Sequence, residues 1–99
     1  MEGSTGPKPS ARLDLPEELT IFEVAAAHRD LCAKLDEGRP LVVQASRLHT
    51  CDTAGAQLIV AAKQAWRDKG LDFVIEEASE PWNFCIKMIG CDKFLASNT

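Results

Sequence analysis

The strongest hydrophobic pattern in the chain lies within residues 49–69, where apolar residues recur at intervals of three and four positions. This spacing places them on one face of a helix and predicts an amphipathic helix. The shared face is formed by Leu58, Ile59, Ala62, Ala65 and Trp66. A short polar turn carrying Asp52 and Thr53 leads directly into this helix. We therefore expect the turn to lie at a helix N-terminus.

The first turn of this helix has a distinct chemistry. Its first backbone N–H groups have no partners inside the helix, and the aligned peptide dipoles add partial positive charge, so an anion or a phosphoryl group is well tolerated there. Either Asp52 or Thr53 can cap this end, and the other side chain then faces solvent. Gly55 and Ala56 are small, which lets a neighbouring strand or a partner protein approach the first turn closely.

An earlier helix is predicted to begin after Thr20, because Thr20 and Glu23 have the spacing of a capping box. It is expected to end at Gly38, before Pro40. Its apolar face is formed by Val24, Ala27, Leu31 and Leu35. His28 falls on the same stripe, and we expect it to be packed or half-buried rather than functional.

A last helix is predicted to begin after Ser79, a suitable N-cap, with Pro81 in the first turn. Gly90 is expected to end it. Its apolar stripe is expected to consist of Phe84, Cys85, Met88 and Ile89. Trp82 lies slightly off that stripe. An exposed tryptophan at a helix start would indicate a docking surface, although partial burial at a helix end is the more common outcome.

Three apolar runs are typical of strands. Residues 12–15 suit a short edge strand, the only strand predicted before the first helix, and residues 71–75 suit another strand. Residues 41–43 fit an inner strand buried on both faces. The alternation predicts an α/β fold, with a small, mostly parallel four-stranded sheet and helices packed against it. The loop of residues 46–53 is then expected beyond the carboxyl ends of the strands, where functional groups gather in such sheets.

The composition narrows the class of protein. With 99 residues, the chain is expected to form a single domain, residues 11–99, after a flexible N-terminal tail, residues 1–10. The formal net charge is -4 and no basic run exceeds two residues, which argues against a nucleic-acid surface. No apolar run approaches the roughly 18 residues needed to cross a bilayer, and the N-terminus lacks a secretory layout. We therefore expect a cytoplasmic protein without membrane insertion.

The chain offers little for catalysis or metal binding. Its four cysteines show no CxxC spacing, and we expect mostly buried free thiols rather than disulfides or metal ligands. These cysteines are Cys32, Cys51, Cys85 and Cys91. His49, Cys51 and Asp52 could be drawn as a base, a nucleophile and an orienting group, but successive residues on an extended segment face opposite sides. We therefore expect no enzyme, no cofactor and no metal.

Several dispersed motifs together resemble the STAS domain family, the small domains that include bacterial anti-sigma-factor antagonists. The motifs are Glu18-Leu19 ahead of the first helix, Leu41-Val42-Val43-Gln44-Ala45-Ser46 along the central strand and its exit, Cys51-Asp52-Thr53-Ala54-Gly55 at the turn, and Met88-Ile89-Gly90-Cys91-Asp92-Lys93-Phe94 near the end. The resemblance covers about the last nine-tenths of the chain. It implies a STAS-like version of the α/β fold.

In that family, a serine/threonine kinase phosphorylates the hydroxyl directly after the aspartate of the turn motif, which is Thr53 in this chain. The resemblance thus implies a module that regulates transcription by binding proteins, an anti-sigma factor or serine/threonine kinase and a phosphatase. The unmodified form is expected to capture the partner, and the protein to be a monomer or a weak dimer. The expected partner-binding residues are Ser46, Arg47, Asp52, Thr53, Ala54, Gly55 and Trp82.

Two alternatives stay open at this point. Thr53 could be a phosphoacceptor, or it could be only a contact or the N-cap of the helix. The protein could also be an accessory STAS subunit of a lipid-transport ABC ATPase, or a STAS component of a chemotaxis or other two-component signalling array. An acceptor hydroxyl must face solvent, so the position of the Thr53 side chain bears directly on the first alternative.

Overall fold

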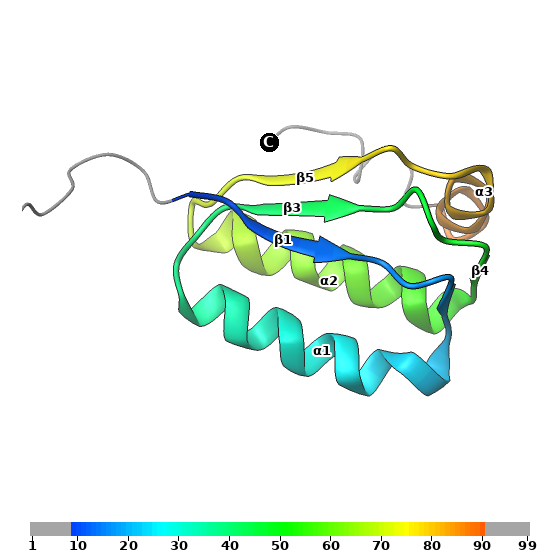
Figure 1. The fold of residues 1–99 in the computed structure, drawn as a ribbon, viewed down its shortest axis with the longest axis horizontal. Coiled ribbons are helices and arrows are strands. Elements are labelled where there is room, and N and C mark those ends of the chain that lie inside the picture. The colour runs from blue at the N-terminus through cyan, green and yellow to red at the C-terminus, as the bar shows by residue number, and fades with distance from the viewer. Residues whose placement is uncertain (1–8, 91–99) are drawn as a thin grey trace, which may run out of the picture.

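A three-stranded parallel sheet forms the centre of the fold (Figure 1). The computed structural model describes residues 9–90. Strand β3 (Leu41–Gln44) is central, with β1 (Ala11–Asp14) on one side and β5 (Phe73–Glu76) on the other. Two very short strands, β2 (Glu18–Leu19) and β4 (Thr50–Cys51), form a separate parallel pair. Their pairing joins the segment before the first helix to the segment before the second.

The three predicted helices are all present. They are α1 (Ile21–Asp36), α2 (Thr53–Asp68) and α3 (Glu80–Met88). The α/β class and the parallel sheet are confirmed, but the strands form a set of three and a pair rather than one sheet of four. Two strands precede α1 instead of the predicted one, because the two residues of β2 are too few to show a periodic pattern. Of the predicted N-terminal tail, residues 1–10, residues 1–8 lie outside the described residues.

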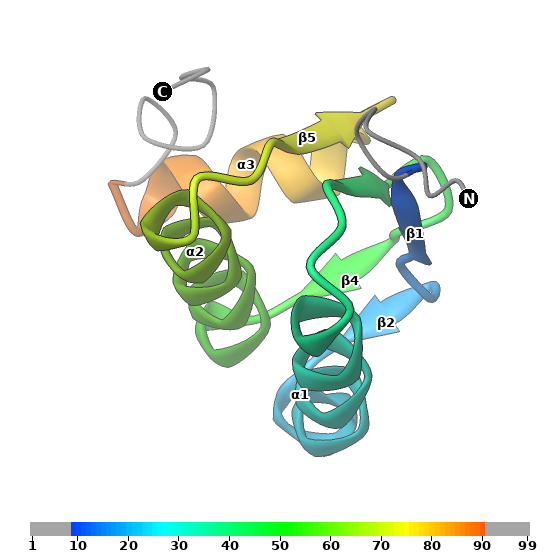
Figure 2. The same cartoon turned by 90° about the vertical axis from the view of Figure 1, so that its left-hand side faces the viewer.

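Helices α1 and α2 lie side by side on one face of the sheet (Figures 1 and 2). Leu41 and Val43 of β3 are fully buried, and so is Trp66 of α2, whose indole Nε1 donates a hydrogen bond to the Arg39 carbonyl at 2.9 Å. Val42, on the alternate face of β3, is only half-buried. The expectation that this strand is buried on both faces is therefore wrong. A central parallel strand buries one face when both of these helices cover the same side.

The pattern of α3 differs from the predicted stripe. Trp82, Cys85 and Ile86 face the core, and Trp82 is only 1% exposed. Phe84 and Met88 are instead 67% and 71% exposed. Both sets have helical spacing, so periodicity alone cannot choose between them. The set that contains the large tryptophan is the one that packs inward.

The first turn of α2 lies directly against β2. Gly55 is buried there, and a Cβ atom at this position would overlap the backbone carbonyl oxygen of Leu19. Leu19 is itself completely buried and hydrogen-bonded through its carbonyl to the Asp52 N–H at 3.4 Å. The small residue at position 55 thus allows the close approach of a strand of the same chain.

Among residues 9–90, no helix is long and apolar enough to cross a membrane.

We predict that Gly55→Ala destabilises the fold by at least about 2 kcal/mol, because the added methyl group meets backbone that the β2–β4 pair holds in place. This loss exceeds the roughly 1 kcal/mol that alanine gains over glycine inside a helix. Urea unfolding measures the difference. Gln57→Ala, an exposed change in the same helix, is the matched control and should stay within about 0.5 kcal/mol of wild type. Equal stability of the two variants would show that the close approach is not tight.

Candidate functional site

The candidate site lies beyond the carboxyl ends of the three sheet strands (Figure 1). There, α1 and α2 both begin, the β2–β4 pair joins their starting points, and α3 lies alongside β4. The loop that contains Asp52 and Thr53 is at this end, as the strand order predicts. We call this region the docking corner and define it by Ile21, Phe22, Asp52, Thr53, Phe84 and Met88.

A single carboxylate connects the starts of both long helices. Asp52 is the N-cap of α2, and its Oδ1 accepts a hydrogen bond from the Gly55 N–H at 2.9 Å. Its Oδ2 accepts a second bond at 3.0 Å from the N–H of Ile21, the first residue of α1. Each bond satisfies a backbone N–H that has no partner inside its helix. Asp52 therefore fixes the relative position of the two helix starts.

These hydrogen bonds also change the acidity of the carboxyl group. The Gly55 N–H lowers the pKa of Asp52 most, and the Ile21 N–H lowers it further, because both bonds favour the ionised form. The pKa of Glu23 is lowered as well, mainly by the Thr20 hydroxyl in the capping box of α1. Both carboxylates thus stay ionised well below neutral pH, which keeps the caps in place.

The structure assigns the cap to Asp52 and leaves Thr53 outside it. Thr53 is the first residue of α2, and its side chain is exposed. Within the part of the chain that the structure describes, its hydroxyl has no hydrogen-bond partner. The alternative in which Thr53 is the N-cap is therefore wrong. A hydroxyl at this position is open to another protein and lies at the positive end of the α2 dipole.

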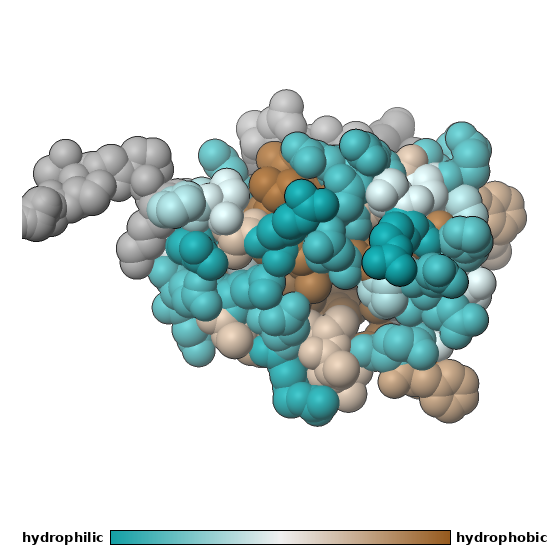
Figure 3. All heavy atoms as spheres, viewed as in Figure 1, coloured by the Kyte–Doolittle hydropathy of each residue, from teal (hydrophilic) through white to brown (hydrophobic). Residues whose placement is uncertain are grey.

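Thr53 lies at the edge of an open hollow of about 340 Å³. Its lining comes from the β4 segment and α3: His49, Thr50, Cys51, Asp52, Thr53, Pro81, Phe84, Cys85, Met88 and Ile89. Phe84 and Met88, which line the hollow, contribute exposed apolar surface. Ile21 and Phe22, which are 66% and 88% exposed, contribute it near Asp52 at the start of α1. Figure 3 shows hydrophobic groups projecting at this end of the molecule.

Two thiols support the loop from the inside. The Sγ atoms of Cys51 and Cys85 each donate a hydrogen bond at 3.4 Å to the backbone carbonyl of Asp52. Burial, with a further contribution from Cys85, raises the pKa of Cys51 to about 12. Because the thiolate is the nucleophile, Cys51 is a poor one at neutral pH. His49, Cys51 and Asp52 line the same hollow, but Asp52 is engaged by the two helix starts and Cys51 by a carbonyl.

The remaining residues expected to bind a partner divide into two groups. Ser46 and Arg47 are exposed in the turn after β3, but they do not line the hollow, and Ala54 is half-buried. Gly55 and Trp82 are buried, the first against β2 and the second in the core, so neither is available to a partner. The prediction that Gly55 and Trp82 bind a partner is therefore wrong.

Sequence reasoning missed the apolar part of the docking corner. Ile21, Phe22, Phe84 and Met88 are large and apolar, yet all four are exposed. For Ile21 and Phe22, a signal was present in the sequence, since neither belongs to the apolar stripe assigned to the first helix. For Phe84 and Met88, their assignment to the buried stripe of the last helix concealed their exposure.

Across residues 9–90, no group of three or more His, Cys, Asp or Glu side chains is placed to hold a metal ion.

A family model described as "Mlab, STAS domain" matches residues 5–96 of the chain. The chain belongs to this STAS family. No curated protein matches it. The family confirms the resemblance drawn from the dispersed motifs and accounts for the small parallel sheet with helices against it. STAS domains mediate protein–protein interactions.

We predict that Asp52→Asn lowers the Tm at pH 7 by several degrees. An amide keeps the shape but has a single acceptor oxygen, so it can serve only one of the two helix starts. The pKa of Asp52 is depressed in the folded state, so its stabilisation is complete above the unfolded pKa and is lost as pH falls through the folded pKa. The gap in Tm between wild type and variant should therefore narrow in acid. Thermal unfolding monitored by circular dichroism at a series of pH values measures this.

The control for this series is Asp72→Asn, which removes an exposed carboxylate far from the helix starts in sequence. It should leave the Tm nearly unchanged across the same pH range. Glu23 is present in every variant, and the Asp52 charge is the smallest of the causes that shift its pKa, so its titration largely cancels from the comparison. A gap between wild type and Asp52→Asn that stays constant from neutral to acidic pH would contradict the assigned role of the carboxylate.

Proposed function

We propose that this STAS protein is a non-enzymatic, cytoplasmic module that binds a protein partner at the docking corner, and that phosphorylation of Thr53 by a serine/threonine kinase controls the binding. As in the anti-sigma-factor antagonists that the sequence resembles, the unmodified form captures the partner, and a phosphatase restores it. The observation that carries the proposal is the exposed Thr53 hydroxyl. Because Asp52 is the N-cap of α2, this hydroxyl is not needed to cap the helix.

The surroundings of Thr53 support a charge-based switch. Phosphorylation would add about -1.5 to -2 charges next to the ionised Asp52 carboxylate. The positive end of α2 tolerates this charge within the folded protein. A partner that covers Phe84 and Met88 with apolar groups would have to remove water from the phosphate as well, which opposes binding. The same phosphate would strengthen binding only to a partner that presents arginine or lysine there.

A second function is favoured by the amount of exposed apolar surface. Permanent interfaces are more apolar than transient ones, and four large apolar side chains are exposed at the docking corner. This fits a constitutive accessory subunit, such as a STAS subunit on the ATPase of a lipid-transport ABC complex. In that case Asp52 and Thr53 form part of a contact that persists without phosphorylation.

We predict that Thr53→Glu weakens partner binding by about tenfold or more, whereas Thr53→Ala abolishes phosphate uptake from the cognate kinase. Both variants should fold normally, since Thr53 is not the cap, and Thr53→Ala should change the free energy of unfolding by less than about 0.5 kcal/mol. Pull-down from the native cell, quantified by mass spectrometry, and kinase assays with radiolabelled ATP measure these effects. Thr53→Ser keeps the hydroxyl and is the matched control for phosphate uptake.

Two outcomes decide between the candidate functions. Loss of a captured protein in Thr53→Glu, together with phosphate uptake at Thr53 in wild type and Thr53→Ser, supports the switch. Capture of the same proteins by wild type and Thr53→Glu, without phosphate uptake, contradicts the switch and favours the constitutive subunit.

We also predict that Phe84→Ser weakens partner binding by about tenfold to thirtyfold in either case, because exposed aromatic residues at the centre of an interface contribute strongly. The fold should be unaffected, since Phe84 is 67% exposed. Val74→Ser removes a partly exposed apolar side chain from the sheet, away from the hollow, and should leave binding unchanged. Isothermal titration with the captured partner measures both. Equal binding by the two variants would place the interface elsewhere.

A further inference from the structure

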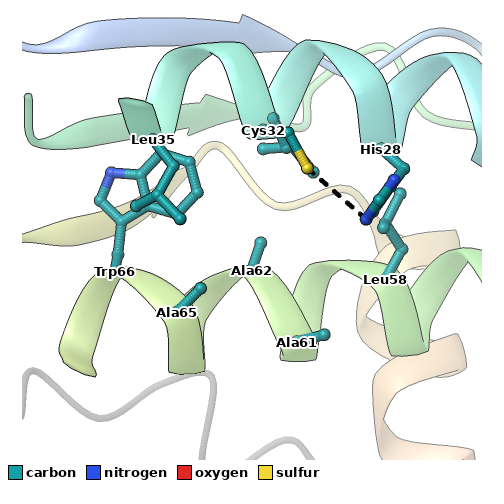
Figure 4. A pocket seen from close by; sticks show the side chains of 9 residues that line it. His28, Cys32, Leu35, Leu58, Ala61, Ala62, Ala65 and Trp66 are labelled. Carbon is teal, nitrogen blue, oxygen red and sulfur yellow. Dashed lines mark hydrogen bonds between the residues drawn. The ribbon is translucent and has the colours of Figure 1, made fainter. Parts of the chain in front are cut away.

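His28 and Cys32 lie one turn apart on α1, at the edge of a cavity between α1 and α2 (Figure 4). Their side chains point toward each other, and His28 Nε2 and Cys32 Sγ are joined by a hydrogen bond at 3.6 Å. Both residues are exposed, so the expectations of a packed histidine and a buried thiol are wrong for this pair. Expected burial was one of the reasons against Cys32 as a metal ligand, and its exposure removes that reason.

The distance between the two atoms matches a metal site. In tetrahedral zinc sites the Zn–S distance is about 2.3 Å and the Zn–N distance about 2.0–2.1 Å, which places a sulfur and a nitrogen ligand about 3.6 Å apart. The pair therefore already has the separation of one edge of a zinc tetrahedron. Spacing by four residues on a helix holds both side chains on the same face, so little ordering remains to be done on binding.

One chain supplies only half of such a site. Over the described range, residues 9–90, no third His, Cys, Asp or Glu completes a metal-holding group. We propose that His28 and Cys32 form one half of a tetrahedral zinc site, which the same pair of a second copy of this chain completes. The full ligand set is then two thiolates and two imidazoles, a known closed combination for structural zinc. Two α1 helices face each other across the metal ion.

The cavity beside the pair suits a covered interface. It has a volume of about 100 Å³, and its lining includes Leu35, Leu58, Ala61 and Ala65. The small alanines of α2 leave this space open between α1 and α2 (Figure 4). A second copy bound on α1 would exclude water from this cavity between α1 and α2. The apolar surroundings would then strengthen the attraction between the metal ion and the thiolates. Without the second copy, water would occupy two of the four coordination positions of the zinc ion.

Zinc binding has a definite proton balance. Each Cys32 thiol releases its proton to solvent as the Zn–S bond forms, and each His28 binds through a neutral ring nitrogen. No electrons are transferred. Zinc-dependent dimerisation should therefore weaken as pH falls. This site goes beyond the proposed function, because it involves neither Thr53 nor the hollow beside α3.

The test uses the full chain, stripped of metal and kept reduced with a phosphine. Sedimentation equilibrium during Zn²⁺ titration should show a monomer that becomes a dimer at one zinc ion per two chains. Co²⁺ in place of zinc should give the absorption of tetrahedral cobalt with a thiolate charge-transfer band. Cys32→Ser and His28→Ala should each lower the apparent metal affinity by more than about a hundredfold, the upper range for losing even an outer-shell partner. Circular dichroism should show unchanged folding, since both side chains are exposed.

Cys91→Ser, which removes a different thiol and leaves the α1 pair intact, should dimerise with zinc as wild type does. A dimer that forms with zinc in both Cys32→Ser and His28→Ala would overturn the assignment. A monomer that binds zinc one to one, or the absence of any zinc-dependent dimer, would overturn the shared site as well.

Discussion

The carboxylate of Asp52 is the interaction on which the rest of the structure depends. One oxygen accepts from the N–H of Gly55 and the other from the N–H of Ile21, so a single side chain holds the first turns of α1 and α2 together. The two-residue strands β2 and β4 bring these turns close, and the absence of a side chain at Gly55 lets α2 approach the backbone of Leu19. The Asp52 carboxylate, the β2–β4 pair and Gly55 therefore all act where α1 and α2 begin.

The exposure of the side chains at the docking corner follows from this arrangement. Because Asp52 is the cap, the hydroxyl of Thr53 faces away from the helix and remains exposed. The thiols of Cys51 and Cys85 hold the Asp52 carbonyl from the inner side, and burial keeps Cys51 protonated, which makes it a support rather than a nucleophile. The surface here carries the Thr53 hydroxyl, the Asp52 carboxylate and the apolar side chains of Phe84 and Met88, with His49 and Thr50 beside them. In our proposal, this combination is what a protein partner recognises.

Much of this fold could be predicted from the sequence, for identifiable reasons. The capping box of Thr20 and Glu23, the N-cap Ser79 and the apolar face of α2 are local patterns, and the structure confirms each of them. The strand β2 was missed because its pairing with β4 is a long-range contact that two residues cannot signal. The inward face of α3 was misjudged because two stripes had helical spacing, and only packing against the core selects Trp82 over Phe84. The identity of the α2 cap needed coordinates, since Asp and Thr both belong to the preferred N-cap residues and stand next to each other here.

The central claim is that one ionised carboxylate accepts hydrogen bonds from two helix starts at once. Its most direct test is an NMR titration of the backbone amide protons of Ile21 and Gly55 from neutral pH into acid. The account predicts that both amide shifts move together with one apparent pKa, below the roughly 3.9 of an ordinary aspartate. An amide that does not follow this titration, or a shared pKa at or above the ordinary value, would contradict it.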